Sequence, residues 1–359
     1  AIHTALLFSI ILGAAMAVAG IFLTPLLLEL VKCPQDVYPE ALQYLRIYLI
    51  GVFFTSVYNI ASGVLRAVGD SRTPLYYLAA ACGLNIVLDL LLVAVFHMGV
   101  RGVAIATIFS QCMAVFLIFR NMLTTKDVYK VSLDGLRLDK IILRRVLKLG
   151  LPAAVQNSLI TFSNLFIQRY INSFGASAMA GIGAAKKVDK YVSTVAGAIG
   201  LATAVFVAQN VGARKFDRVR KGILSTMAIS LTGIALVGLP AYFFAPWLIR
   251  IFTSDAESIQ FGEAMIRTIV PFYYAQALHR IFSNTVRGYG HSGIAMITTA
   301  VGMILCRQAY LITAMHLHYN VQNIYISYPV GWICSAALSI AFYLLILRKN
   351  NRRMLAGGT

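Results

Sequence analysis

Long apolar runs separated by shorter polar segments define the predicted elements of this chain. Ten runs are long enough to cross the hydrocarbon core of a bilayer, which takes about 20 helical residues. They cover residues 3–28, 41–65, 75–97, 102–119, 149–171, 178–210, 223–249, 262–286, 294–315 and 324–347. We therefore expect an all-α polytopic membrane protein, because helices satisfy their own backbone hydrogen bonds in lipid.

The positive charge is concentrated on one side of this predicted topology. Hydrophobic residues make up 59% of the sequence and charged residues 12%, with a net charge of +18. One set of alternate connections sums to +15 and the other set to −3. Lys and Arg accumulate in cytoplasmic loops, so the first set and both ends of this chain are predicted to face the cytoplasm. We expect a bacterial cytoplasmic (plasma) membrane protein with no nucleic-acid partner.

Several residues recur at a constant offset of 221, which indicates an internal duplication. The matched pairs are Phe22 and Phe243, Pro25 and Pro246, Arg46 and Arg267, Ser62 and Ser283, Arg66 and Arg287, Gly69 and Gly290, and Ser71 and Ser292. Both copies run in the same direction, which predicts a parallel repeat of two pseudo-symmetric bundles with an axis along the membrane normal. The first two helices of the second copy would have their counterparts upstream of Ala1.

The duplication and the polar connections together predict four parts. Residues 1–122 form the N-lobe and contain helices 3–6 of a six-helix bundle, and residues 123–147 form a cytoplasmic linker. Residues 148–347 form the C-lobe, a complete six-helix bundle, and residues 348–359 form a basic cytoplasmic tail.

One acidic residue lies deep inside an apolar run. Asp89 belongs to the run 75–97, and a charged group at that depth costs at least a few kcal/mol unless it faces protein, water or a partner. Asn85 precedes it by four residues, so the two side chains share one helix face. The pair is predicted to form an ion or substrate site; the alternative is a structural hydrogen-bond acceptor.

Six stretches resemble the multidrug and toxic compound extrusion (MATE) family of transporters. They are Gly63–Pro74, Leu84–Asp89, Gly99–Thr107, Leu149–Pro152, Phe174–Ala176 and Ala208–Ala213. The resemblance covers nearly the whole chain. It implies twelve helices in two six-helix lobes, and an antiporter that exports organic, cationic solutes against sodium or protons by alternating access.

The resemblance also implies a cation site in the N-lobe. The residues that match the family pattern are Asn85, Asp89 and Thr107, with either Ser62 or Asn59 as a further polar ligand. Oxygen ligands suit a hard cation, and the carboxylate could instead take a proton. Sodium or a proton is thus the expected coupling ion, without a further cofactor or metal.

The second copy departs from the first at these places. Adding 221 to Asn85, Asp89 and Thr107 leads to Cys306, Tyr310 and Tyr328, so no second site of this type is expected.

A charged cluster in the run 178–210 has two interpretations. Lys186 and Asp189 could pair at i and i+3, with Lys187 and Lys190 beside them in the wall of a substrate cavity. Alternatively, the helix begins later and the cluster lies near the membrane interface. His279, in the middle of the run 262–286, is a further candidate for the cavity wall or for a buried structural contact.

Three functions follow as hypotheses. The first is a cation-coupled exporter of small organic solutes, expected to be monomeric and to contact membrane lipids. The alternative is a flippase for lipid-linked saccharide precursors, which would need a cationic cavity; the lysine cluster is its best support. An enzyme would need clustered nucleophiles, bases or metal ligands, which the sequence does not suggest.

Overall fold

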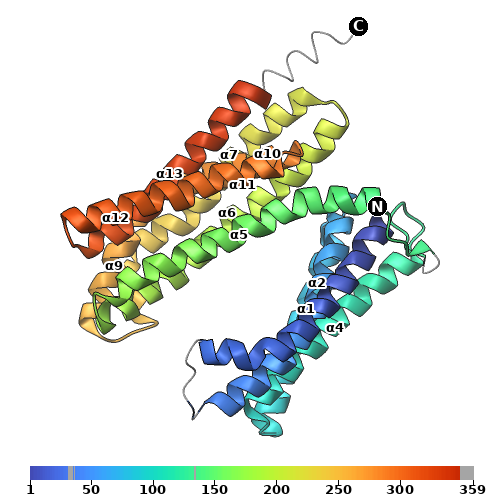
Figure 1. The fold of residues 1–359 in the computed structure, drawn as a ribbon, viewed down its shortest axis with the longest axis horizontal. Helices are drawn as coiled ribbons and strands as arrows, with labels where there is room; N and C mark the ends of the chain where they lie inside the picture. Colours follow the sequence, from blue (N-terminus) through green and yellow to red (C-terminus); the bar gives the residue numbers. More distant parts are fainter. Residues whose placement is uncertain (31–34, 36, 133–134, 348–359) are drawn as a thin grey trace. The chain divides into compact units, whose positions relative to one another are not determined.

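The computed structural model describes residues 1–30, 35, 37–132 and 135–347, and every described regular element is helical (Figure 1). The α-helices are α1 (Ile2–Leu30), α2 (Tyr38–Ala67), α3 (Arg72–Asp89), α4 (Gly99–Thr124), α5 (Lys140–Asn172), α6 (Ala176–Gly212), α7 (Phe216–Phe243), α8 (Ala245–Arg250), α9 (Ala256–Ile269), α10 (Tyr273–Gly288), α11 (Ser292–Ala300), α12 (Arg307–Leu317) and α13 (Val321–Phe342). Three π-helical segments, η1 (Leu90–Val95), η4 (Val301–Cys306) and η5 (Tyr343–Leu347), and one 3₁₀ turn, η3 (Val270–Phe272), extend or join them. The predicted basic tail, 348–359, lies outside the described residues.

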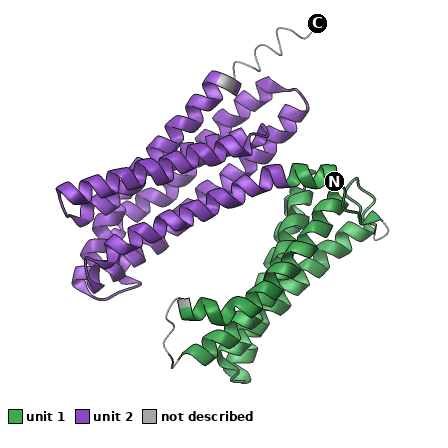
Figure 2. Ribbon diagram, in the orientation of Figure 1, with its two compact units in different colours: residues 1–146 green, residues 147–359 purple. Residues whose placement is uncertain are grey.

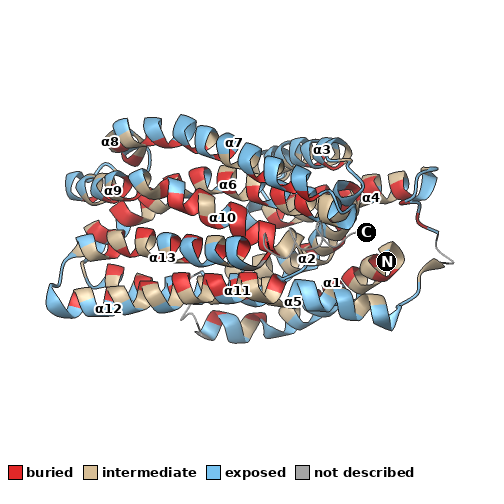
Figure 3. Ribbon diagram, turned by 90° about the horizontal axis from the view of Figure 1, so that it is seen from above, coloured by how far each residue is buried: buried red, intermediate tan, exposed pale blue. Residues whose placement is uncertain are grey.

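The chain forms two compact units, residues 1–146 and 147–359 (Figure 2). In the first unit α2 packs against α1 and α4, and α4 also packs against α3. In the second unit α6 contacts α7, α9 and α10, while α13 contacts α10 and η4. Helix α10 is buried along most of its length (Figure 3). The boundary between the units falls inside α5, so the last part of the segment predicted as a linker, 123–147, is helical.

Among the described residues, eight helices are long and apolar enough to span a membrane, which confirms the polytopic all-α class. The two predicted spans that do not meet this measure have identifiable reasons. Within α5, the predicted span 149–171 carries amide side chains at Gln156, Asn157, Asn164 and Gln168, which lower its hydropathy. The predicted span 262–286 is divided by η3 at Pro271 into α9 and α10, each shorter than a bilayer-crossing helix.

The predicted span 223–249 is likewise not a single helix. Helix α7 ends at Phe243, and α8 begins at Ala245 with Pro246 in its first turn, where the missing backbone N–H of proline costs least. The repeat partner Pro25 lies inside α1, which continues past it. The same residue type therefore starts a helix in the second unit and is accommodated within a helix in the first.

The two units do share one helix ending. Helices α2 and α10 are each followed by a glycine with positive φ, +96° at Gly69 and +85° at Gly290. In both, the glycine N–H bonds to the carbonyl three residues back, and the next N–H bonds to the carbonyl five residues back, as in a Schellman motif. This local repetition agrees with the duplication at offset 221.

The turn after Gly69 leads directly into α3. Asp70 Oδ1 accepts hydrogen bonds from the N–H groups of Arg72 at 3.1 Å and Thr73 at 3.0 Å. The hydroxyl and backbone N–H of Thr73, followed by the N–H of Arg72, hold the pKa of Asp70 below its usual 3.8. The carboxylate thus satisfies backbone donors that the start of α3 would otherwise leave unpaired.

Helices α6 and α9 approach each other at glycines. A Cβ atom placed on Gly181 would lie 2.0 Å from the carbonyl oxygen of Ser258, and one placed on Gly262 would lie 2.8 Å from the carbonyl oxygen of Gly181. Backbone is therefore in direct contact with backbone, the geometry that small residues permit between membrane helices.

Candidate functional site

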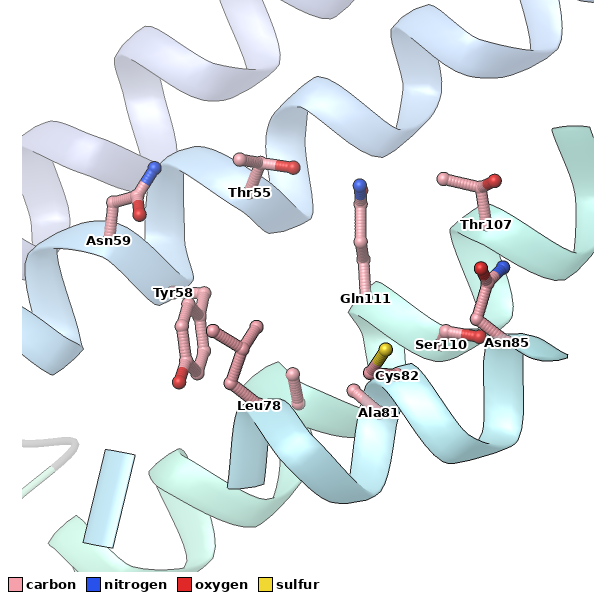
Figure 4. A pocket seen from close by; sticks show the side chains of 11 residues that line it. Thr55, Tyr58, Asn59, Leu78, Ala81, Cys82, Asn85, Thr107, Ser110 and Gln111 are labelled. Atoms are coloured by element: carbon pink, nitrogen blue, oxygen red, sulfur yellow. The ribbon is translucent and has the colours of Figure 1, made fainter. Parts of the chain in front are cut away.

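A cavity of about 280 Å³ lies between α2, α3 and α4 of the first unit (Figure 4). Most of its wall is apolar, as is usual for small-molecule and ion sites that use a few placed polar groups. Its amide and aliphatic hydroxyl side chains are Thr55, Asn59, Asn85, Thr107, Ser110 and Gln111. Each of the three helices contributes to this polar set.

The three hydroxyl groups in this set already donate hydrogen bonds within their own helices. Thr55, Thr107 and Ser110 each donate to the backbone carbonyl four residues earlier, at 3.1, 2.9 and 2.7 Å. A hydroxyl that has donated its proton offers only lone pairs to other groups. Toward the cavity, these side chains can therefore act as acceptors or as ligands of a cation.

Three further polar atoms on this side of the unit are buried without a hydrogen-bond partner. They are Asn85 Nδ2, Gln111 Oε1 and Asp89 Oδ1. Such atoms cost about 1–3 kcal/mol each, and more when charged, so a native site that retains them requires a reason. Asp89 itself does not line the cavity; it lies one turn beyond Asn85, where α3 gives way to the π-helical segment η1. Such π-helical winding is frequent at functional sites.

The structure distinguishes between the two residues predicted for α2. Asn59 lines the cavity, whereas Ser62 is 2% exposed, lies outside the lining and accepts a hydrogen bond from Arg66 one turn later. In Figure 4, Asn85 and Thr107 are drawn at one end of the cavity and Asn59 at the other, with Gln111 between them. The cavity thus unites three of the five predicted residues, Asn59, Asn85 and Thr107.

Gln111 and Thr55 were missed by the sequence prediction, although a signal for both was present. Gln111 follows Thr107 by four residues, and Thr55 precedes Asn59 by four. Residues at i and i+4 share a helix face, so a polar pair at this spacing inside an apolar run predicts a polar face. The side chain of Gln111 has room because Gly51 lies opposite it; a Cβ atom there would come within 2.8 Å of Gln111 Oε1.

At the repeat positions the second unit has a different character. Beside Cys306, Arg307 is 1% exposed, donates to Ser163 Oγ on α5 and lies 5.7 Å from the centre of the Tyr328 ring. A guanidinium held in this way serves packing and repels cations.

The lysine cluster of α6 does not form the predicted ion pair. Lys186 Nζ donates to Gln168 Oε1 on α5 at 3.0 Å, and no Lys186–Asp189 contact within 4.0 Å is present among the described residues. The reason is that Asp189 faces the hydroxyls of Ser193 and Tyr273, so the lysine stem reaches across to α5 instead. Lys187 and Lys190 are exposed, and Lys187 Nζ lies 4.8 Å from the Phe252 ring centre.

The last candidate, His279, lines a second polar cavity, which lies wholly within the second unit. It has a volume of about 230 Å³ and is bounded by α5, α6, α10, η4 and α13. Arg280 and Arg287 line it as well. The cationic wall expected from lysines on α6 is therefore formed by arginines on α10.

Comparison with known proteins identifies the family. The MatE family model matches residues 1–91 and 152–310, which is more than half of the chain. The chain belongs to the multidrug and toxic compound extrusion family. Its helices and apolar spans make this MATE family member a membrane protein.

Two curated relatives come from Bacillus subtilis. This MATE family member is 34% identical to the probable multidrug resistance protein YpnP over 78% of its own length and 62% of the relative's. It is 28% identical to the probable multidrug resistance protein YoeA over 97% of its own length and 77% of that relative's. The chain thus spans less than two thirds of YpnP.

A solved structure agrees with the fold. The Vibrio cholerae MATE transporter VcmN in the bent form superimposes with a TM-score of 0.87 at 21% identity, covering 96% of this chain and 78% of that one. At this level of identity the likeness bears on the fold alone.

Proposed function

We propose that the protein exports small organic solutes by antiport, and that the coupling ion, sodium or a proton, binds in the first unit at Asp89, Asn85, Thr107 and Gln111. The similarity to YpnP and YoeA, which are named as probable multidrug resistance proteins, supports the export part of this proposal. We further propose that the protein acts as a monomer in the bacterial cytoplasmic membrane, with both ends of this chain in the cytoplasm.

The observation that carries the proposal is the unpartnered carboxylate oxygen of Asp89. Its Oδ1 atom is buried without a hydrogen bond in a helix that is apolar enough to span a membrane. An ionised carboxylate in such surroundings is costly, and binding of a cation or a proton removes that cost. Binding of the cation or proton thereby neutralises the carboxylate of Asp89 on α3.

The remaining ligands fit a hard cation equally well. Carbonyl oxygens of Asn85 and Gln111 and the hydroxyl oxygen of Thr107 are neutral acceptors of the kind that complete an oxygen shell around a single carboxylate. A proton would need only Asp89. The two ions can therefore be distinguished by substituting the neutral ligands, since this should impair sodium-driven transport and leave proton-driven transport unchanged.

The flippase alternative loses the support of the lysine cluster. Lys187 and Lys190 are exposed, and Lys186 is engaged by Gln168, so these lysines line none of the described cavities. The unpartnered acid of the first unit favours the antiporter.

A transport assay with Asp89→Asn tests the proposal. The complete protein is reconstituted in vesicles, and movement of a fluorescent organic cation is followed under an imposed sodium gradient and, separately, an imposed proton gradient. We expect the wild type to respond to one gradient and Asp89→Asn to lose that response, because the amide is similar in size but cannot balance a cation or release a proton. Undiminished ion-driven transport in Asp89→Asn would refute the role of Asp89.

The matched control is Asp70→Asn. It removes an acid of the same unit that lies in the turn between α2 and α3, where the carboxylate contacts backbone N–H groups. Transport should be retained in this variant. Loss in both would point to a general effect of acid removal on folding or insertion.

A further inference from the structure

The cavity of the second unit is built from polar groups that have no function in the cation site. Its polar lining comprises Gln156 and Asn157 on α5, and Gln276, His279, Arg280, Ser283, Asn284 and Arg287 on α10. Every residue of the lining belongs to the second unit. The cavity is therefore described within the second unit alone.

Two guanidinium groups give this cavity its positive charge. Arg287 donates to Gln156 Oε1 through one terminal nitrogen, while its Nε is buried without a partner. The side chain of Arg280 makes no hydrogen bond among the described residues. The described carboxylate whose charge acts on it is Asp189 on α6, which does not form an ion pair with it. Within the described part of the chain, no carboxylate oxygen comes within 4.0 Å of either arginine. The positive charge of the cavity is therefore available to a ligand.

Three buried side chains present further unpaired atoms along the same wall. Gln276, His279 and Asn284 are 4%, 6% and 7% exposed, and Gln276 Oε1, His279 Nδ1 and Asn284 Oδ1 have no hydrogen-bond partner. The amide nitrogens of Gln276 and Asn284 are already engaged, with Ser193 Oγ at 2.9 Å and the Arg280 carbonyl at 2.8 Å. Their free oxygens are therefore acceptors, which call for donors on a ligand.

We propose that this cavity binds an oxyanion, a carboxylate or a phosphate, carried by a small polar group that also has hydroxyl or amine donors. The arginines recognise the oxyanion through charge-assisted hydrogen bonds, and the oxygens of Gln276 and Asn284 accept from the donors. At about 30 Å³ per water molecule, a volume of about 230 Å³ holds seven or eight waters. This space matches a head group of a few heavy atoms.

Binding of such a group can be measured without transport. The complete protein, purified in detergent and kept free of sodium, is titrated with glycerol 3-phosphate, with inorganic phosphate and with uncharged glycerol, at ionic strength fixed by chloride. Saturable binding of glycerol 3-phosphate, weaker binding of phosphate and none of glycerol is the expected order. If neither anion binds saturably, the proposal is overturned.

Two variants and one control locate the site. Arg280→Gln should raise the apparent Kd for glycerol 3-phosphate about tenfold or more, the factor that follows from losing one charge-assisted hydrogen bond. Asn157→Asp places a carboxylate on the cavity wall at an exposed, nearly isosteric position and should weaken binding similarly while the fold is kept. Arg267→Gln removes a half-exposed arginine that pairs with Glu263 outside the cavity and should leave the Kd unchanged. Equal affinity in wild type and Asn157→Asp would contradict the assignment.

The source of the oxyanion is resolved by a second measurement. Mass spectrometry of the purified protein shows whether phospholipid is retained by the wild type and lost from Arg280→Gln, which would assign the site to a lipid phosphate. Binding of glycerol 3-phosphate to delipidated protein without such retention would assign it to a solute. That this solute is exported rests on the proposed function, whereas binding does not. A failure to bind therefore leaves the Asp89 test intact, and a failure of Asp89→Asn leaves the binding result intact.

Discussion

Substitution of Gly181 by alanine should separate α6 from α9. The added Cβ atom would lie 2.0 Å from the Ser258 carbonyl oxygen, whereas ordinary contact begins at 3.4 Å, so the helices must move apart by about 1.4 Å (3.4 − 2.0). The obstacle is backbone and cannot rotate away. Overpacking of this kind costs about 1–3 kcal/mol. Because the obstacle is rigid, the cost should lie at the upper end, about 3 kcal/mol. The better helix propensity of alanine offsets about 1 kcal/mol, so Gly181→Ala should lower the free energy of unfolding by about 2 kcal/mol.

The matched control lies two residues away on the same helix. A Cβ atom on Gly183 meets nothing within 4 Å, so Gly183→Ala should gain up to about 1 kcal/mol from helix propensity alone. The two variants should then differ by about 3 kcal/mol, or about 6–12 °C in Tm at about 2–4 °C per kcal/mol. Thermal unfolding of the purified variants in one detergent measures this difference. Equal melting temperatures would refute the close backbone contact.

Two further results are expected. If sodium is the coupling ion, Gln111→Leu should raise the sodium concentration for half-maximal transport about tenfold, because a neutral ligand is lost. A proton-driven cycle would be unaffected. An unchanged sodium dependence in a sodium-driven transporter would show that Gln111 is not a ligand. Asp70→Ala should lower the stability at pH 7 by about 0.5–1 kcal/mol through loss of backbone capping. Because the folded pKa of Asp70 is depressed below 3.8, its contribution is present above that value and is lost as the pH falls through the folded pKa, so melting curves of wild type and Asp70→Ala should converge in acid.

The apolar pattern was sufficient to predict helices but not their interruptions. The runs 3–28 and 41–65 correspond to α1 and α2, because a bilayer-length apolar segment has one regular solution. The break after Phe243 could not be predicted from composition, since Pro25 and Pro246 occupy repeat positions and only Pro246 begins a new helix. Packing around each proline decides between these outcomes.

The family resemblance, with helical spacing for Asn85 and Asp89, predicted part of the cavity lining but not all of it. Asn85 and Thr107 line the cavity, and Asp89 lies one turn from Asn85. Spacing along one helix cannot tell which polar faces of different helices meet, so Gln111 was overlooked. It also could not exclude the Lys186–Asp189 pair, because both ends of a possible pair can find other partners, as Lys186 does with Gln168.

The matching helix ends at Gly69 and Gly290 have a consequence for how the protein could have evolved. A Schellman ending is specified by a few residues at the end of a helix and makes no demand on the side chains in the middle of the bundle. After a gene duplication, each copy could therefore keep its backbone course while its interior diverged. The first copy now carries a buried carboxylate oxygen at Asp89 and the second a cavity lined by the guanidinium of Arg280, so one ancestral scaffold would have given rise to two interiors with charged groups of opposite sign.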